Sequence, residues 1–255
     1  MLKKRLIFSL LYDSGYFSLS RNFRLQRVGD LKWLKENYNF EYISKYIDEL
    51  IVIDVSKKGR DRESFCKVLK ELTEKIFVPI SSGGGIREFD HAKKLLNSGA
   101  DKVIINSSIF TDTNLVQSLA SEFGRQCIVG SVDLKKTNEN YSFYISNGTE
   151  RINKSFPEIM KILKACPLGE IIIHSVDRDG TGQGFDLEVL SLLEKDIQLP
   201  IIISGGAGNG KHFVEGLKNE LVDAVSSSHL FNFVGDGLKK ARSQAIESDI
   251  LLAKW

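Results

Sequence analysis

Two glycine-rich turns carry the residue types best suited to binding an anion. One contains Gly84 and Gly85 in PISSGGGI, and the other contains Gly205 and Gly206 in PIIISGGAG. Glycine lets backbone N–H groups approach an anion closely, and the N-terminus of a following helix adds its dipole. A single turn of this kind is equally well explained as a tight loop, but the duplicated pair favours two phosphate sites.

Polar residues from the neighbouring segments complete both sites. NSS follows the apolar run KVII, SSS ends DAVSSS, and DRDG supplies a further glycine. Two such sites would suit a small molecule that is phosphorylated at both ends. The predicted phosphate-binding residues are Gly84, Gly85, Asn106, Ser107, Gly180, Gly205, Gly206, Ser227 and Ser228.

Eight short apolar runs alternate with helical patterns along the chain, and the glycine-rich turns follow two of these runs. The runs cover residues 5–11, 49–54, 77–82, 102–106, 127–133, 170–176, 200–204 and 223–228. Apolar strands separated by amphipathic helices predict a parallel sheet with covered faces, and eight such units close a barrel. We therefore expect an α/β protein, a (β/α)8 TIM barrel, with the glycine-rich turns at the C-terminal ends of its strands.

The whole chain, residues 1–255, is predicted to be a single domain. The alternating segment YSFYIS and the NG pair that follows it predict a hairpin inserted near residues 135–152. No linker or low-complexity segment interrupts the pattern of strands and helices.

The sequence also repeats itself with a period of about 122 residues. The matching pairs are Pro79 and Pro200, Asp101 and Asp223, and Asp54 and Asp177. Three pairs in the same order predict two similar half-barrels of four β/α units each. The same offset pairs Asp133 with Leu11, so one half carries a carboxylate where the other carries leucine.

Charge and cysteine content narrow the class of protein. Lys and Arg number 35 against 33 Asp and Glu, which gives no reason to expect a nucleic-acid partner. Cys66, Cys127 and Cys166 are far apart, which favours reduced thiols in a cytoplasmic protein. The apolar run at the N-terminus is too short for a signal peptide, and we expect no membrane association.

Two further motifs resemble ion-binding or nucleotide-binding loops but are rejected. GGAGNGK resembles a P-loop, but His212 stands where Ser or Thr would bind magnesium. DRDGTGQGFDLE has acidic residues near the spacing of a calcium loop, but it follows a strand rather than a helix. We therefore expect neither a metal nor a cofactor.

Taken together and in order, seven segments resemble the cyclase subunit of imidazole glycerol phosphate synthase. They are KKRLIFSLL, DELIVIDVS, PISSGGGIRE, GADKVIINSS, VGSVDLKK, SVDRDGTGQGFD and PIIISGGAGN. The resemblance implies a duplicated TIM barrel that forms a heterodimer with a glutaminase, receives its ammonia, and uses two aspartates as acid and base. Asp133 matches one aspartate, but Leu11 stands at the position of the other, and Leu19 stands where a basic residue is expected. Leucine cannot exchange a proton, so the cyclase reaction should lose orders of magnitude in rate.

The resemblance also implies an ammonia gate at the N-terminal face of the barrel. The matching residues are Arg5, Glu49, Lys102 and Glu170, each at the start of a predicted strand. By the same resemblance, Asp101 would face the glutaminase. Each residue taken singly is better explained as a surface charge, but the presence of all four residue types together favours a retained gate.

With a retained gate and a broken acid/base pair, the chain resembles a divergent branch of the family. Members of that branch act with a glutaminase and a sugar amidotransferase. That similarity implies a barrel that activates the glutaminase and channels ammonia for amidation of an N-acetyl sugar in surface polysaccharide biosynthesis. Two alternatives stay open: the cyclase (a lyase) of histidine biosynthesis, and a non-catalytic barrel that binds a phosphorylated ligand. His174 and His229 are either proton donors or hydrogen-bonded wall residues.

Overall fold

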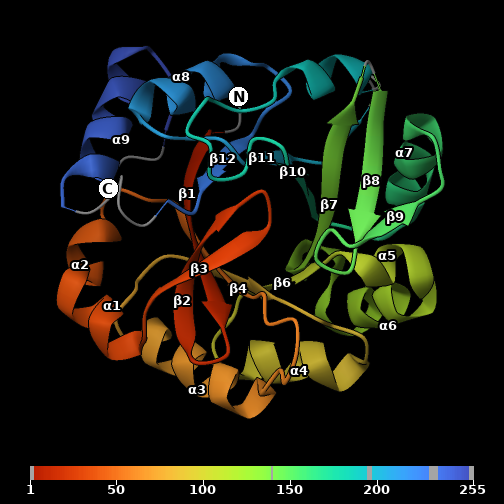
Figure 1. Cartoon of the computed structure of the whole chain (residues 1–255), viewed down its shortest axis with the longest axis horizontal. Helices are drawn as coiled ribbons and strands as arrows, with labels where there is room; N and C mark the ends of the chain where they lie inside the picture. The colour runs from red at the N-terminus through yellow and green to blue at the C-terminus, as the bar shows by residue number, and fades with distance from the viewer. Residues whose placement is uncertain (1–2, 139, 194–196, 230–234, 253–255) are drawn as a thin grey trace.

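The fold is built on a closed barrel of parallel strands. The computed structural model describes residues 3–138, 140–193, 197–229 and 235–252. Within these ranges eight strands pair in parallel around a circle that β12 closes by pairing with β1 (Figure 1). In barrel order they are β1 (Arg5–Asp13), β4 (Glu49–Asp54), β5 (Ile80–Gly83), β6 (Lys102–Ile105), β7 (Ile128–Thr137), β10 (Glu170–Ser175), β11 (Ile201–Ser204) and β12 (Ala224–Ser227). The TIM barrel expected from the sequence is confirmed.

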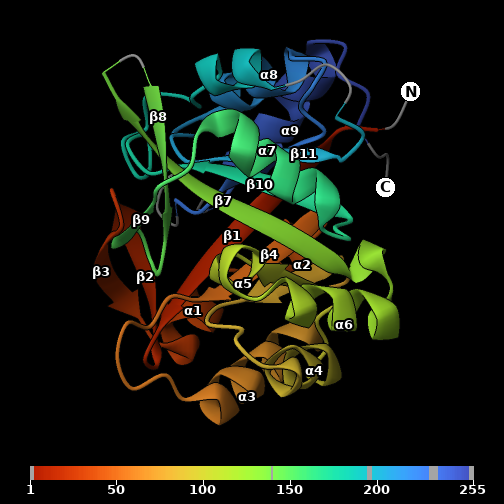
Figure 2. The same cartoon turned by 90° about the vertical axis from the view of Figure 1, so that its right-hand side faces the viewer.

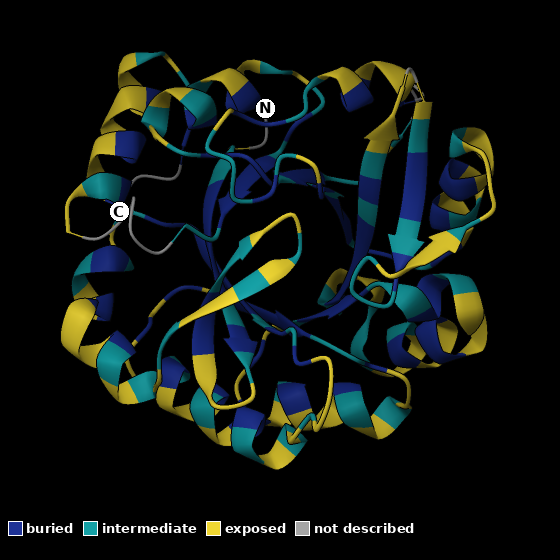
Figure 3. Cartoon of the chain, viewed as in Figure 1, coloured by how far each residue is buried: buried dark blue, intermediate teal, exposed yellow. Residues whose placement is uncertain are grey.

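Helices surround the barrel, and each α-helix of the described chain buries side chains against it. Figure 3 shows buried strands ringed by helices whose outer faces are exposed. In α3, for example, Phe65, Leu69 and Leu72 are buried, and the Asp61 carboxylate caps the helix by accepting a hydrogen bond from the Ser64 amide. The α-helices are α1 (Leu31–Asn37), α2 (Phe40–Ile43), α3 (Arg62–Thr73), α4 (Phe89–Asn97), α5 (Ser107–Thr111), α6 (Thr113–Phe123), α7 (Phe156–Ala165), α8 (Gly210–Lys218) and α9 (Gly237–Glu247), and the 3₁₀ helices are η1 (Arg125–Cys127) and η2 (Glu188–Leu192). In the described ranges no helix has the length and apolar character needed to cross a membrane.

An antiparallel hairpin extends the barrel at an equivalent place in each half. β1 is followed by β2 (Tyr16–Arg21) and β3 (Arg24–Gly29), and β7 is followed by β8 (Asn140–Ile145) and β9 (Glu150–Ile152). The strands of the second hairpin lie within residues 140–152. The first hairpin was not predicted from the sequence, although the 122-residue repeat implies a counterpart in the first half. Figure 2 shows both hairpins projecting on the same side of the barrel, away from the chain termini.

Local hydrogen bonds also repeat between the two halves. The Nδ1 atom of His91 accepts a hydrogen bond from the Arg87 amide at 3.3 Å, just after β5. The Nδ1 atom of His212 accepts one from the Gly208 amide at 3.1 Å, just after β11. Both histidines therefore anchor the glycine-rich turn that precedes their helix, which agrees with the internal repeat.

A buried ion pair fastens the C-terminal helix to the amino end of the barrel. The guanidinium of Arg242, on α9, binds both carboxylate oxygens of Asp48 at 3.0 and 3.2 Å. Asp48 also accepts a hydrogen bond from the Leu6 amide at 2.8 Å, at the start of β1. Both charged side chains are buried. Removal of one charge would therefore leave the other without compensation in the interior.

We predict that Arg242→Met lowers the free energy of unfolding by about 3–5 kcal/mol, because Asp48 would then remain buried without its partner. Urea unfolding at pH 7 measures this change. Lys94→Met is the matched control, because it breaks the exposed ion pair of Lys94 with Glu63 and should leave the unfolding midpoint nearly unchanged. Equal effects of the two variants would contradict the prediction.

Candidate functional site at the two ends of the barrel

The amino ends of the strands bring together a ring of four charged side chains. Arg5 of β1 contacts Glu49 of β4, with Nη1 3.1 Å from Oε2, and it also contacts Glu170 of β10. Lys102 of β6 contacts the same two carboxylates, with Nζ 2.9 Å from Oε2 of Glu49. Ser81 of β5 donates a further hydrogen bond to Glu49. Each carboxylate therefore bridges both cations, so the four residues that the sequence analysis assigned to a gate form one closed ring.

The ring is largely buried, and its opposite charges stabilise one another. The side chains of Glu49 and Glu170 are 2% and 10% exposed, which leaves little room for water to replace a lost partner. Burial acts to raise the pKa of Glu170, but the hydrogen bond and charge of Arg5, together with Lys102, outweigh it and hold the pKa below its ordinary value. Burial acts to lower the pKa of Lys102, but Glu49 and Glu170 outweigh it and raise the pKa. The Glu170 carboxylate and the Lys102 ammonium are thus held in their charged forms.

Asp101 lies beside the ring at the start of β6 and is exposed. Its Oδ2 atom accepts a hydrogen bond from the Ile80 amide at 2.8 Å. Asp223 makes the same contact with the Ile201 amide at 2.9 Å, so part of the role of Asp101 is to cap a neighbouring strand.

An apolar layer fills the barrel above the ring. Its members come from seven of the eight parallel strands of the described chain: Ile7, Ile51, Ile104, Val129, Ile172, Ile202 and Ala224. Above this layer Ser9 and Ser226 are hydrogen-bonded through their hydroxyl groups at 2.6 Å. The charged ring therefore lies at the amino end of the barrel, and buried side chains separate it from the carboxyl end, which we call the mouth.

At the carboxyl end, Asp133 and Leu11 take the places that the repeat assigns to them. Asp133 lies on β7, where it is paired in register with His174 of β10. Leu11 lies on β1, where it is paired with Ile53 of β4, and its side chain is partly exposed. The mouth therefore has a carboxylate on one side and an apolar side chain at the equivalent position, as expected from the sequence.

The environment of Asp133 makes its carboxyl group more basic than an ordinary aspartate. Burial raises the pKa of Asp133 to about 6. The charge of His174 acts in the opposite direction, and the nearby Asp179 adds to the increase. A carboxylate with such a pKa can accept and return a proton near neutral pH.

His174 lies beside Asp133 and has one unpartnered nitrogen. Its Nδ1 atom is 3.0 Å from the Ser204 hydroxyl oxygen. Its Nε2 atom is buried without a hydrogen-bond partner in the described structure, and it lies 3.9 Å from Oδ1 of Asp179. The ring of Phe23 covers the imidazole, with 5.3 Å between the ring centroids. His229, at the end of β12, is half-buried, and burial lowers its pKa.

The first predicted phosphate site contains two arginines that the sequence analysis missed. Arg60 lies so close to Gly85 that a Cβ atom added to Gly85 would be 1.7 Å from the Nη1 atom of Arg60. Arg60 is paired with Asp54, with 3.0 Å between Nε and Oδ2, and Arg62 donates to the Gly85 carbonyl at 3.0 Å. Their signal in the sequence is the cationic segment KKGRDR, residues 57–62, in the loop that follows β4.

Both predicted phosphate sites keep their residues together at the mouth. Asn106 and Ser107 lie at the start of α5, next to the turn that contains Gly85. In the second half, the Gly184 amide donates to the Gly206 carbonyl at 2.9 Å, and the Ser227 hydroxyl donates to the Ala207 carbonyl at 3.4 Å. These bonds join the loops after β10, β11 and β12 into one surface.

Each hairpin reaches across the mouth to the opposite half of the barrel. The Asn22 side-chain amide, in the β2–β3 turn, donates to the carbonyls of Val176 and Asp177 at 3.0 Å. The Asn147 side-chain amide, in the β8–β9 turn, donates to the Val55 carbonyl at 3.4 Å. In Figure 1 the β2–β3 hairpin lies over the barrel opening. The two hairpins therefore cover the site from both sides.

Asp179 and Gly180 are fitted to the β2–β3 hairpin. The buried carboxylate of Asp179 accepts hydrogen bonds from the Ser20 hydroxyl and from the Phe23 amide, the latter at 3.1 Å. Gly180 has a φ of +67°, and a Cβ atom there would lie 2.0 Å from the Ser20 carbonyl oxygen. Gly180 is thus needed for the hairpin to dock, in addition to any role in binding phosphate.

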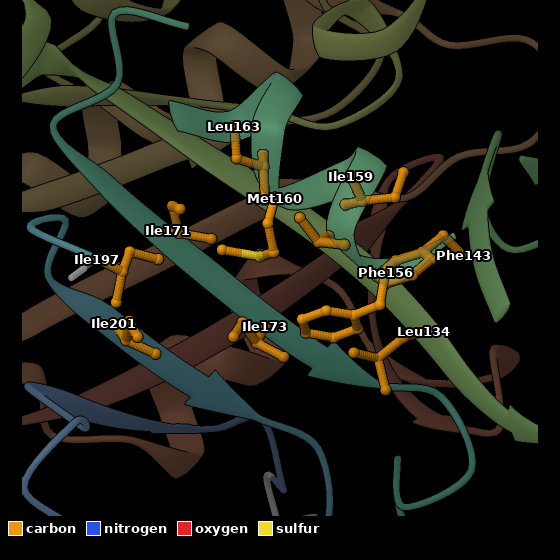
Figure 4. Close-up of a pocket in the computed structure, with 11 residues that line it drawn as sticks. Leu134, Phe143, Phe156, Ile159, Met160, Leu163, Ile171, Ile173, Ile197 and Ile201 are labelled. Atoms are coloured by element: carbon orange, nitrogen blue, oxygen red, sulfur yellow. The ribbon is translucent and has the colours of Figure 1, made fainter. Parts of the chain in front are cut away.

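One small apolar pocket of the described structure is not part of this site. It lies outside the barrel, between α7 and the strands β7, β10 and β11 (Figure 4). Its cavity measures about 10 Å³ and is lined entirely by apolar side chains, among them Phe156, Met160 and Ile173. This volume is at the lower limit for one water molecule, and no polar group is present to hold a ligand.

Comparison with known proteins places the chain among homologues that it matches over nearly its full length. The family model described as "Histidine biosynthesis protein" matches residues 36–234. A protein of Parasynechococcus marenigrum (strain WH8102), provisionally named imidazole glycerol phosphate synthase subunit hisF2, is 48% identical over 100% of this chain and 95% of its own length. The imidazole glycerol phosphate synthase subunit HisF of Clostridium botulinum (strain 657 / Type Ba4) is 35% identical over 91% of this chain and 92% of its own length.

We predict that the charged ring makes stability depend on pH in the acid range. The pKa of Glu170 is lower in the folded chain than in the unfolded chain, where it is about 4.3. Its contribution is therefore complete above that pH and is lost as the pH falls through the folded pKa. Urea unfolding should show Glu170→Gln less stable than the wild type by about 2 kcal/mol at pH 7, with the difference shrinking below pH of about 4. A difference that stays constant from pH 7 to pH 3 would contradict this.

Proposed function

The chain belongs to the histidine biosynthesis protein family, as a homologue of the HisF subunits of imidazole glycerol phosphate synthase, and from this we propose that it is the barrel subunit of a two-subunit glutamine amidotransferase. The amino end of the barrel binds a glutaminase and stimulates it. Ammonia released by glutamine hydrolysis passes the charged ring and enters the barrel. The carboxyl end holds the molecule that takes up the ammonia.

The observation that carries this proposal is the closed ring of Arg5, Glu49, Lys102 and Glu170. Burying charged side chains costs several kcal/mol per ion unless they are well paired. Replacing buried ion pairs by apolar residues of similar volume is often neutral or stabilising, so stability alone does not account for the ring. Control of a small polar molecule at the amino end is a task that would account for it.

A phosphorylated ligand at the mouth is the second part of the proposal. The glycine-rich turns lie at the ends of β5 and β11, where ligands of TIM barrels bind. Arg60 and Arg62 add positive charge beside Gly85. Backbone amides near these arginines would suit a phosphate group in the first half, and the loops joined through Gly206 would suit a second phosphate.

Leu11 indicates that the final reaction differs from the family's cyclisation. The position requires a proton-transferring group in the family, and the structure places an apolar, partly exposed side chain there. We therefore propose that the ammonia is used for amidation of an N-acetyl sugar in surface polysaccharide biosynthesis, together with a sugar amidotransferase. The relatives named as imidazole glycerol phosphate synthase subunits favour one alternative, the cyclase of histidine biosynthesis.

We predict that this protein stimulates glutamine hydrolysis by its cognate glutaminase. Asp101→Asn should weaken the complex about tenfold, because it removes an exposed charge at the docking face while an amide oxygen can still cap Ile80. Titration of the glutaminase with wild-type and variant protein, followed by glutamate release, measures the effect. The control Asp90→Asn removes an exposed charge on α4 and should behave as wild type.

Two outcomes would overturn the glutaminase proposal. The first is the absence of any rise in glutamate release at saturating amounts of this protein. The second is an equal weakening by Asp101→Asn and Asp90→Asn, because this would place docking somewhere other than the amino end of the barrel.

We also predict that the purified chain, supplied with free ammonia and the phosphoribulosyl intermediate of histidine biosynthesis, shows little or no cyclisation. Leu11→Asp should restore measurable turnover, because it supplies the missing proton-transferring group, whereas Leu11→Asn should not. Product formation followed by absorbance or mass spectrometry checks this. Turnover at an ordinary enzymic rate in the wild type, abolished by Asp133→Asn, would establish the histidine-biosynthesis alternative instead.

A further inference from the structure

We propose that the outer face of the β2–β3 hairpin is the docking surface for the enzyme that takes up the ammonia, and that Arg21 and Arg24 bind carboxylates of that enzyme. This inference rests on the proposed function, because it concerns the protein that receives ammonia at the mouth. It adds a second interface, at the opposite end of the barrel from the glutaminase.

Arg21 and Arg24 lie directly opposite each other at the tip of the hairpin. They are register partners on β2 and β3, on either side of the turn that contains Asn22 and Phe23. Like charges placed directly opposite on neighbouring strands destabilise the pairing. Both residues are exposed, and neither side chain makes an ion pair or a hydrogen bond within the described residues. A carboxylate of a bound partner would offset their repulsion.

A third arginine of the hairpin differs from these two because it has partners. The Nε atom of Arg27 is 3.2 Å from Oδ2 of Asp13, and its guanidinium lies over the ring of Tyr16, 4.9 Å from the centroid. The hairpin therefore supplies counter-groups for Arg27, but within the described chain it leaves the two arginines at its tip without any.

The docking of the hairpin directs the two arginines away from the barrel. Ser20 donates a hydrogen bond to the buried carboxylate of Asp179, so its side chain points toward the loops of the barrel. Neighbouring residues of a strand point to opposite faces, so Arg21 and its register partner point outward. A Cβ atom on Gly148 would lie 2.6 Å from the ring of Phe23, so the two hairpin turns meet over the mouth. A ligand that contacts both arginines therefore lies on top of this cover, and not inside the barrel.

Further cations without partners lie beside the hairpin. Lys57 and Lys58 are exposed and make no ion pair or hydrogen bond within the residues that the structure describes. The hydroxyl of the preceding Ser56 accepts a hydrogen bond from the Ser14 amide at 2.9 Å, which holds this loop against the β1–β2 turn. Carboxylates of the surrounding loops are already paired: Asp13 with Arg27, Asp54 with Arg60, and Glu188 with Lys136. The rim of the mouth thus carries positive charge that complements an acidic surface.

The chemistry of ammonia favours a protein as the occupant of this surface. Ammonia that escapes into water becomes protonated, and ammonium has no lone pair with which to attack an acceptor. An enzyme that uses the ammonia must therefore close the mouth against water during the transfer. The hairpins, which lie over the mouth (Figure 1), are the surface that such an enzyme meets.

The experiment measures binding of the full-length chain to the sugar amidotransferase of the same organism by biolayer interferometry. Wild-type binding should weaken as salt is added, because exposed charges are screened. The double variant Arg21→Gln/Arg24→Gln should bind about tenfold more weakly or worse, and Arg21→Lys/Arg24→Lys should bind more tightly than it, because the charges are kept. The matched control Lys93→Gln/Arg125→Gln removes two exposed charges elsewhere on the barrel and should bind as wild type.

Stimulation of the glutaminase serves as the internal check of each variant. Glutamate release should be unchanged in Arg21→Gln/Arg24→Gln, which shows that the barrel is folded and that its amino end is intact. No binding of the amidotransferase by the wild type, or equal binding by the wild type and this double variant, would overturn the proposal. So would a double variant that loses only self-association, or only binding to phosphatidylglycerol vesicles. Any of these failures would leave the glutaminase proposal standing, whereas no stimulation of the glutaminase by the wild type would remove the proposed function itself.

Discussion

The register of the closed barrel decides which side chains meet inside it, and the chemistry of both ends follows from that register. Along β1, Ile7 belongs to the inner apolar layer, so Arg5 and Leu11, at even spacing from it, face the same way. All eight strands of the described barrel run in parallel, so residues at strand starts converge at one end and residues at strand ends converge at the other. A slip of one residue would move the charged ring and Asp133 to the outside together.

The apolar layer between the two ends allows them to differ independently. Leu11 changes the mouth without touching any partner of Arg5 or Lys102, because the buried isoleucines lie between them. A chain can therefore keep the charged ring at the amino end while the mouth at the carboxyl end binds a different ligand. This separation explains how an intact ring and an altered acid/base pair occur in one protein.

The sequence allowed prediction of the strands and of the ring, but not of what covers the mouth. The strands are short apolar runs, and each of the four ring residues is the first residue of its strand. The local sequence pattern and the family resemblance were therefore sufficient to predict the strands and the ring residues. The contact of Phe23 with His174 could not be predicted from the sequence, because it depends on a turn docking onto a loop about 150 residues away. The hairpin itself could have been predicted, since the repeat relates β2 and β3 to the predicted insertion after β7. The position of Arg60 against Gly85 likewise depends on the path of a loop, which no local periodicity specifies.

We propose separate partners for the two ends of the barrel: a glutaminase at the amino end and a small ligand at the carboxyl end. Amide hydrogen exchange, measured by mass spectrometry with and without the cognate glutaminase, tests this separation. We expect slower exchange in the segments 75–79, 99–101 and 166–169, which precede β5, β6 and β10, and unchanged exchange in the hairpin turns around residues 22 and 147. Protection of the hairpin turns, with the amino-end segments unchanged, would contradict it.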